Sequence, residues 1–244
     1  DDVHSLDILR DTEVHFGGET TLDNGLTVGA HIEATADGGD SFETDESYVY
    51  FAGSWGRVNF GNEDGAAYLL QVAAPSADDN IDGLRQYIDP YATMAGHDYA
   101  NDTFQASDRV TYLSPVFSGF QAGVSYMPDN GAAGSAGNGA DTGVGTQSDA
   151  WELAARYEGM VGNVGVIAGA GYTAAQQEVD AAGSDDFAEW NVGVDLDIGA
   201  FGVGAVYTEN NNALDVEDEN ETWVLGADYT TGPFKVGASY LNND

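Results

Sequence analysis

Apolar and polar residues alternate along most of this chain, in stretches of about ten residues. Clear examples are 120–126, 201–207 and 234–240, where an aromatic residue stands at both ends and small apolar residues lie between. A period of two is that of a β-strand, because successive side chains point to opposite faces of the sheet. A soluble sheet could bury the apolar face against a second layer, whereas a membrane barrel turns it to lipid.

The alternation predicts twelve strands, roughly 12–22, 26–36, 45–54, 57–62, 108–115, 119–127, 148–157, 163–173, 187–198, 201–209, 221–229 and 233–241. Short and long connections follow one another in turn. The short ones are 23–25, 54–56, 115–119, 158–163, 199–200 and 230–233, and the long ones are 37–44, 63–107, 128–147, 174–186 and 210–220. An up-and-down sheet therefore has its tight turns at one end and its long loops at the other, as bacterial outer-membrane barrels do. A Greek-key sandwich would not sort its loops so strictly.

The two faces of the predicted strands differ in charge. The apolar face carries no charged residue and includes Val14, Phe16, Leu22, Val28, Ile32, Val49, Phe51, Val58, Phe60, Val110, Tyr112, Trp151, Leu153, Trp190, Val192, Val194, Leu196, Trp223 and Leu225. The opposite face carries Glu13, His15, Glu19, His31, Glu33, Arg57, Asn59, Arg109, Gln121, Glu152, Arg156, Glu189, Asp195, Asp197, Asp228 and Lys235. Unpaired charges are too costly to bury in a packed core, so water is expected inside. A twisted sheet packed on one face explains the alternation equally well, but not the aromatic ends or the sorted loops.

Composition narrows the function. The chain has 244 residues, 33 glycines, no cysteine and a net charge of −36, from 42 acids against six bases. This charge argues against nucleic acid as a partner, although it also suits solubility or adaptation to salt. No run of about 18 apolar residues predicts a membrane-spanning helix. The chain begins Asp1-Asp2-Val3 without a visible signal peptide, and we interpret it as a mature or partial chain.

Enzymatic activity is not expected. The sequence contains no Gly-x-Ser-x-Gly, no HExxH and no glycine-rich phosphate loop with lysine. The four histidines are too dispersed along the sequence to indicate a zinc site.

Several segments, in this order, resemble the general porins of Gram-negative bacteria, particularly the alphaproteobacterial type. They are Glu13-Val14-His15-Phe16-Gly17-Gly18 with Thr21-Leu22-Asp23-Asn24-Gly25-Leu26-Thr27-Val28-Gly29-Ala30, Tyr48-Val49-Tyr50-Phe51-Ala52-Gly53-Ser54-Trp55-Gly56-Arg57-Val58, Asn59-Phe60-Gly61-Asn62-Glu63-Asp64-Gly65-Ala66, and Arg109-Val110-Thr111-Tyr112-Leu113-Ser114-Pro115 with Phe117-Ser118-Gly119-Phe120-Gln121-Ala122-Gly123-Val124-Ser125-Tyr126. None of these segments is diagnostic alone, but together they span most of the chain.

The resemblance implies an all-β transmembrane antiparallel up-and-down barrel of about sixteen strands in the outer membrane. It also implies a homotrimer in contact with lipid and lipopolysaccharide, and a long loop folded inward as a constriction. The family's long loop follows its fifth strand, whereas here it follows the fourth predicted one. We therefore expect 1–244 to be a single barrel domain that is incomplete at both ends; a twelve-strand barrel with a displaced loop is the alternative.

The connection 63–107 is the expected constriction loop, because a connection of this length usually has a function or is disordered. Its apolar pieces, 67–73 and Leu84, Tyr87, Ile88 and Tyr91, are suited to docking on the wall, and the first favours a short helix. The acids predicted at the constriction are Glu63, Asp64, Asp78, Asp79, Asp82 and Asp89. Clustered carboxylates are ligands for calcium, so Asp78, Asp79 and Asp82, and the run 215–221, are weak candidate sites. No other cofactor is expected.

In the family, a basic cluster on the wall opposes the acids of this loop. Arg57 and Arg109 lie on strands that flank the loop and face inward by parity, and Arg10 is a further candidate. The other predicted wall residues are Glu13, His15, Glu19, His31 and Glu33. Because bases are few, a negative lumen that concentrates cations is expected.

Three functions stay open from the sequence. The first is a diffusion porin for ions and small hydrophilic solutes that prefers cations. The second is a structural or adhesive outer-membrane barrel with a closed lumen. The third is a soluble, acidic, secreted β protein.

Overall fold

The computed structural model describes residues 12–36, 43–75, 99–130, 143–214 and 219–244. Within these ranges the chain forms twelve strands and one short helix. The strands are β1 (Glu13–Thr21), β2 (Thr27–Thr35), β3 (Glu43–Gly53), β4 (Gly56–Glu63), β5 (Ser107–Leu113), β6 (Phe120–Asp129), β7 (Gln147–Val161), β8 (Val164–Gln177), β9 (Phe187–Ile198), β10 (Phe201–Asn210), β11 (Asn220–Thr231) and β12 (Phe234–Asn243). The helix α1 (Ala66–Leu69) lies between β4 and β5.

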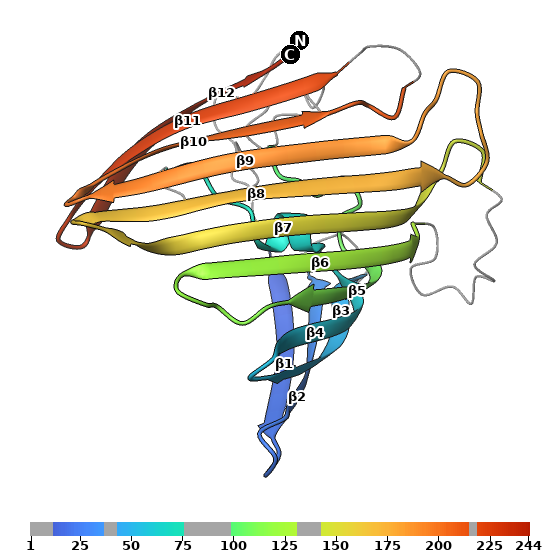
Figure 1. The fold of residues 1–244 in the computed structure, drawn as a ribbon, viewed down its shortest axis with the longest axis horizontal. Coiled ribbons are helices and arrows are strands. Elements are labelled where there is room, and N and C mark those ends of the chain that lie inside the picture. Colours follow the sequence, from blue (N-terminus) through green and yellow to red (C-terminus); the bar gives the residue numbers. More distant parts are fainter. Residues whose placement is uncertain (1–11, 37–42, 76–98, 131–142, 215–218) are drawn as a thin grey trace.

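All twelve strands belong to one antiparallel sheet in sequence order, with β1 and β12 at its edges. The strands turn progressively along the sheet, so that β1 and β2 run at a steep angle to β7, β8 and β9 (Figure 1). The predicted all-β, up-and-down antiparallel architecture is confirmed. A total of about sixteen strands, and a single barrel domain over 1–244, stay predictions.

Two strands are longer than the sequence suggests. The expected strands 148–157 and 163–173 extend to Val161 and Gln177, and their pairing continues to Val161 opposite Val164. Only Gly162 and Asn163 are left for the turn, with Gly162 at a φ of 66°. Two-residue hairpin turns require positive φ, which glycine adopts at little cost, so the pattern Glu158-Gly159 is not the turn it resembles.

The sheet has a polar face that is partly buried and an apolar face that is exposed. Phe16, Leu153 and Phe201 are each more than half exposed. The buried polar residues of the described strands are Asn59, Glu63, Ser107, Arg109, Thr111, Ser125, Ser148, Glu152, Thr173, Glu189, Asn191, Thr208 and Thr222. This is the reverse of a soluble domain and is what a sheet with its outer face in lipid requires. No helix in the described ranges is both long and apolar enough to cross a membrane.

Aromatic rings pair across neighbouring strands of the apolar face at two levels. Next to the long connections the pairs are Tyr126–Trp151, Trp190–Tyr207 and Trp223–Tyr240. Next to the short turns they are Phe120–Tyr157 and Phe201–Tyr229. Amphipathic rings at two levels match the girdles of a membrane barrel at its two interfaces.

Candidate functional site: the inner wall and the segment inserted against it

The connection between β4 and β5 runs along the polar face of the sheet. Its described parts, 64–75 and 99–106, are called the inserted segment below. Helix α1 contacts β5, β6, β7 and β8 and lies against the middle of the sheet (Figure 1). Ala66 and Ala67 of this helix are fully buried. The short helix expected within 67–73 is therefore present and docks on the wall.

The first amides of α1 are held by side chains of the wall. The Ala66 amide donates to Ser125 Oγ at 2.7 Å, and the Ala67 amide donates to Glu152 Oε2 at 3.0 Å. Thr111 Oγ1 lies 2.8 Å from the same Ser125 hydroxyl. Amides at a helix start have no partner within the helix, so these bonds satisfy groups that would otherwise be buried without one.

Glu152 also neutralises a buried arginine. Arg109 Nη1 donates to Glu152 Oε1, and both side chains are almost fully buried. Arg109 Nη2 donates to the carbonyl of Gln105 at 2.6 Å, so the guanidinium binds both the wall and the inserted segment. Breaking such a pair leaves an uncompensated buried charge, which makes it a structural anchor.

Gln71 joins the two ends of the inserted segment. Its Nε2 donates to the Tyr99 carbonyl at 2.7 Å, and its Oε1 accepts from the Asn101 amide at 2.7 Å. The Gln71 carbonyl accepts from Arg156 Nη1 at 2.8 Å, which ties this junction to β7. One buried amide side chain therefore fixes the exit and the return of the connection at one place on the wall.

Tyr99 attaches the returning part to the far strands. Its carbonyl accepts from Thr208 Oγ1 at 2.7 Å, and its hydroxyl accepts from the Ala74 amide at 3.1 Å. The Tyr99 ring packs with Ala74, Val206 and Val224, so the contact reaches β10 and β11.

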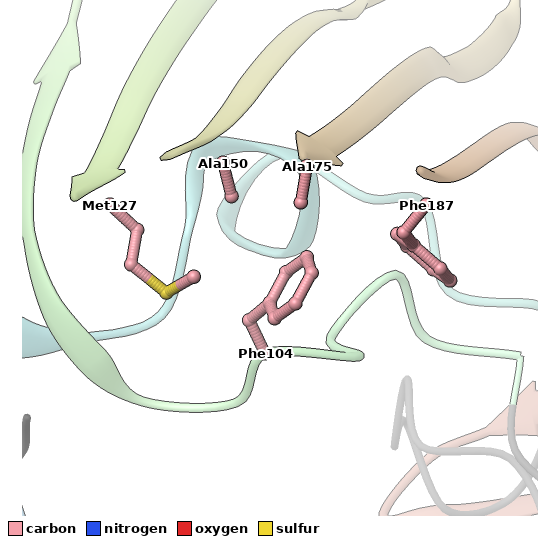
Figure 2. Close-up of a cluster of buried hydrophobic side chains, with 5 residues drawn as sticks. All are labelled: Phe104, Met127, Ala150, Ala175 and Phe187. Carbon is pink, nitrogen blue, oxygen red and sulfur yellow. The ribbon is translucent and has the colours of Figure 1, made fainter. Parts of the chain in front are cut away.

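A second apolar anchor lies near the start of β5. Phe104 packs against Met127, Ala150, Ala175 and Phe187, which come from β6, β7, β8 and β9. Figure 2 shows the Phe104 ring pointing from the inserted segment toward the two alanines, with Met127 on one side and Phe187 on the other. The rings of Phe104 and Phe187 meet edge to face with centroids 5.4 Å apart, a favourable aromatic geometry.

Glycines on the wall make room for the backbone of the inserted segment. A Cβ added at Gly226 would lie 2.0 Å from the Pro75 carbonyl oxygen, and one at Gly193 would lie 2.8 Å from Val72 Cβ. Such close approach is open only to residues without a side chain. The inner faces of β9 and β11 are thus shaped to the segment.

The inner face of β5–β11, which these contacts cover, is called the anchoring wall. The inner face of β1–β3 is called the open wall, because its side chains are more exposed. Here the rings of His15, His31 and Tyr48 follow one another across β1, β2 and β3, and the Tyr50 ring comes next along β3, with successive centroids 5.3–6.5 Å apart. Arg57 of β4 closes the row, its guanidinium carbon 3.9 Å from the centre of the Tyr50 ring, within cation–π range.

Acids outnumber bases on the described inner face. The acids include Glu13, Glu19, Glu33, Glu46, Glu63, Glu152, Glu158, Glu189, Asp195, Asp197 and Asp228, and the bases are Arg57, Arg109, Arg156 and Lys235. Three of these bases already lie beside a carboxylate: Arg109 by Glu152, Arg156 by Glu158 at 3.4 Å, and Lys235 by Asp228 at 3.6 Å. The field of the described inner face is therefore negative.

The structure places some of the predicted site residues. Glu63 is buried at the end of β4 and accepts from Asn59 Nδ2, and Asp64 begins the inserted segment. Arg109 differs from a base presented to water, because the inserted segment covers it and Glu152 binds it. Glu13, His15, Glu19, His31 and Glu33 lie together on the open wall. Arg10, Asp78, Asp79, Asp82 and Asp89 are outside the described residues, so their roles, and calcium on three of them, stay predictions.

Sequence reasoning missed the anchors. Parity placed Glu152 on the inner face, but its partner Ala67 lies 85 residues away along the chain. The sequence predicts that apolar pieces of the connection dock on the wall, but it does not show which polar residues of β5–β11 they cover. The signal in the sequence that points to the anchors is glycine at inward-facing strand positions. Gly193 and Gly226 leave space on the wall, and the long connection with apolar pieces fills it.

The comparisons with known proteins agree on one fold. A family model for Gram-negative porins matches residues 1–244. The chain superposes on an anion-selective porin from Comamonas acidovorans with a TM-score of 0.61 and 18% identity, covering 96% of this chain and 69% of that one. It superposes on OmpT, an outer membrane protein of Vibrio cholerae in an in-vitro folded trimer form, with a TM-score of 0.63 and 17% identity, covering 96% of this chain and 70% of that one. It superposes on a variant of the Rh. blastica porin with a TM-score of 0.62 and 18% identity, covering 95% of this chain and 74% of that one. No curated protein sequence matches the chain.

Proposed function

The chain belongs to the family of Gram-negative porins, which places it in the bacterial outer membrane, and we propose that it forms a water-filled channel that prefers cations. Ions and small hydrophilic solutes would cross it by passive diffusion. The observation that carries this proposal is the reversed sheet, apolar outside and polar inside, with a segment of the chain bonded to its inner face.

The inserted segment supports a channel that is narrowed by part of the chain rather than one of uniform width. Its anchors extend from β5 to β11, and the rest of the connection, residues 76–98, continues between Pro75 and Tyr99. A segment fixed at both ends on the inner wall restricts the width of the water-filled space. Selection by size and charge is the function that such a restriction serves, and no chemical step is proposed for it.

Cation preference rests on charge, because the fold does not decide it. The Comamonas acidovorans relative has the same fold and is described as anion-selective. In this chain the described inner face is acidic, and its bases are mostly matched by carboxylates. A water-filled space bounded by unmatched acids attracts cations and repels anions.

We also propose a homotrimer surrounded by lipid and lipopolysaccharide. A trimer form is named for the Vibrio cholerae relative. The exposed apolar face of this chain offers more contact surface than a monomer in water would keep. Crosslinking in detergent, followed by electrophoresis without boiling, measures the assembly directly.

Reconstitution in a planar bilayer under a salt gradient tests the proposed function. Stepwise openings with a reversal potential set by cations would support it. A reversal potential set by anions would keep the channel and contradict the proposed role of the acids. Folded, inserted protein without conductance would favour the closed structural or adhesive barrel, and protein that stays in water without detergent would favour a soluble secreted one.

A further inference from the structure

The first hairpin brings together two histidines that the sequence keeps apart. Antiparallel pairing of β1 and β2 places His15 opposite Glu33 and His31 opposite Gly17. The two imidazole rings then lie with their centroids 5.5 Å apart on one face of the hairpin. The spacing along the chain conceals this pair, because a hairpin register and not a local motif creates it.

The two rings and Glu33 have the separations of ligands around one ion. His15 Nδ1 lies 2.9 Å from Glu33 Oε2, and His31 Nε2 lies 3.5 Å from the same oxygen. One nitrogen of each histidine and one oxygen of Glu33 all lie within 4.8 Å of one another. Tetrahedral ligands at zinc bond lengths of about 2.1 Å are roughly 3.4 Å apart, so small side-chain rotations suffice to close the set.

Further carboxylates surround the two imidazoles. Glu13 Oε2 lies 3.7 Å from His15 Nε2, the ring nitrogen that points away from Glu33. Glu46 Oε2 lies 4.0 Å from His31 Nε2. A carboxylate beside a ligating histidine orients the ring and strengthens it as a ligand, and negative charge around the site favours a divalent ion.

The cluster is open to water and lies on the inner side of the sheet. The His15 side chain is half exposed, while those of His31 and Glu33 are 26% and 16% exposed. Phe16 and Ile32, the neighbours along the two strands, are exposed on the opposite, apolar face. An ion in the aqueous space can therefore reach the cluster without crossing lipid.

We propose that His15, His31 and Glu33 bind one divalent transition-metal ion of the zinc class, with Glu46 or water completing its coordination. Imidazole nitrogens suit zinc and copper, whereas magnesium and calcium select oxygen ligands. The same contacts would also form without a metal, as hydrogen bonds between the imidazoles and the acids. The metal site differs from such direct contacts because it requires both imidazoles to bind the same ion.

Calorimetric titration of Zn²⁺ into the full chain, folded in detergent and free of any histidine tag, tests the proposal. We expect one Zn²⁺ per chain, without competition from Mg²⁺. His15→Gln or His31→Gln alone should weaken binding by at least about tenfold, and the double variant should bind little more weakly than either single one. Glu158→Gln, which removes an exposed carboxylate on β7, is the control and should bind as the unchanged chain does.

The proposal would be overturned if Zn²⁺ binding survived both single substitutions, or if Mg²⁺ displaced the bound Zn²⁺. Either result would mean that Zn²⁺ binds only to an acidic surface. Each variant must first show the heat-dependent shift in electrophoretic mobility of a folded barrel. If either glutamine variant fails to fold, alanine at the same position replaces it.

This site does not depend on the channel. Zn²⁺ binding without conductance would contradict the proposed function alone, and conductance without Zn²⁺ binding would contradict the metal site alone.

Discussion

The anchoring wall and the open wall have the same alternation of residues but different surroundings. On the anchoring wall Glu152 and Arg109 are almost fully buried, because the inserted segment covers them and they satisfy one another. On the open wall His15 is half exposed and Glu13 is 38% exposed. Strand parity therefore decides which face a side chain takes. The inserted segment decides whether that side chain is buried against protein or faces the aqueous space.

The comparison also separates two uses of charge. A buried carboxylate is tolerated when hydrogen bonds and an opposite charge compensate its lost hydration, as for Glu152 with Arg109 and the Ala67 amide. An exposed carboxylate keeps its hydration and contributes mainly to the field. Substitutions on the anchoring wall should change stability, and substitutions on the open wall should change ion preference.

The largest effect is expected for Glu152→Ala. It leaves Arg109 buried without its partner and the Ala67 amide without an acceptor, at a cost of about 3–5 kcal/mol in the free energy of unfolding. Urea unfolding in detergent measures this loss. Glu158→Ala on the same strand is the control, because Glu158 is two-thirds exposed and its contact with Arg156 should contribute less than about 1 kcal/mol. Equal losses for the two variants would contradict the anchoring role of Glu152.

The next effect is expected for Gly226→Ala. The new methyl group would meet the Pro75 carbonyl oxygen at 2.0 Å, so the inserted segment must move away from β11 at a cost of about 1–3 kcal/mol. Urea unfolding in detergent measures this loss. Gly18→Ala is the control, because its Cβ would meet nothing within 4 Å. An unchanged free energy of unfolding for Gly226→Ala would mean that the segment does not rest on this strand.

A smaller effect, on ion preference, is expected when the acids of the open wall are neutralised. Each unit charge about 8 Å from the ion path contributes about 0.5 kcal/mol at the dielectric constant of water, roughly a twofold change in local cation concentration before screening. Glu13→Gln, Glu19→Gln and Glu33→Gln together should lower the cation-to-anion permeability ratio, measured from the reversal potential. Asp180→Asn with Asp185→Asn, in the long connection after β8, should leave the ratio nearly unchanged. A ratio that responds only to these loop acids would contradict the open wall as the selective surface.

The smallest effect is expected for Tyr50→Phe. The Tyr50 hydroxyl donates to Glu19 Oε2 at 2.6 Å in an exposed position, and losing this bond should cost about 0.5–1 kcal/mol. Urea unfolding should barely separate this variant from the unchanged chain. A loss as large as that of Glu152→Ala would show that the open wall is structural too.

The sequence predicts the strands well because their alternation is local. All twelve strands and the order of short and long connections follow from a period of two and from turn residues near each short connection. The ends of β7 and β8 were harder to predict, since Gly159 resembles a turn residue but is paired within the ladder. The short helix was predictable from the apolar run at 67–73, which is also a local signal.

The anchors and the histidine cluster could not be predicted from the sequence, because both depend on partners far along the chain. Arg109 faces inward by parity, and nothing near it in the sequence shows that Glu152, 43 residues later, will neutralise it. His15 and His31 meet only through the register of the first hairpin. Parity gives the side of the sheet for each of these residues, but it gives neither the neighbour nor the exposure.

The central claim is that the segment 64–75 lies against the inner wall, and a designed disulfide tests it most directly. The chain has no cysteine, so a pair of new ones reports a single contact. A Cβ at Gly171 would lie 3.2 Å from Ala67 Cβ, close to the separation of about 3.5–4.5 Å found in disulfides. Ala67→Cys with Gly171→Cys should crosslink in the folded protein under mild oxidation, and Ala67→Cys with Gly18→Cys should not. Free thiols at both positions in folded, oxidised protein would contradict the inserted segment and the narrowed channel built on it.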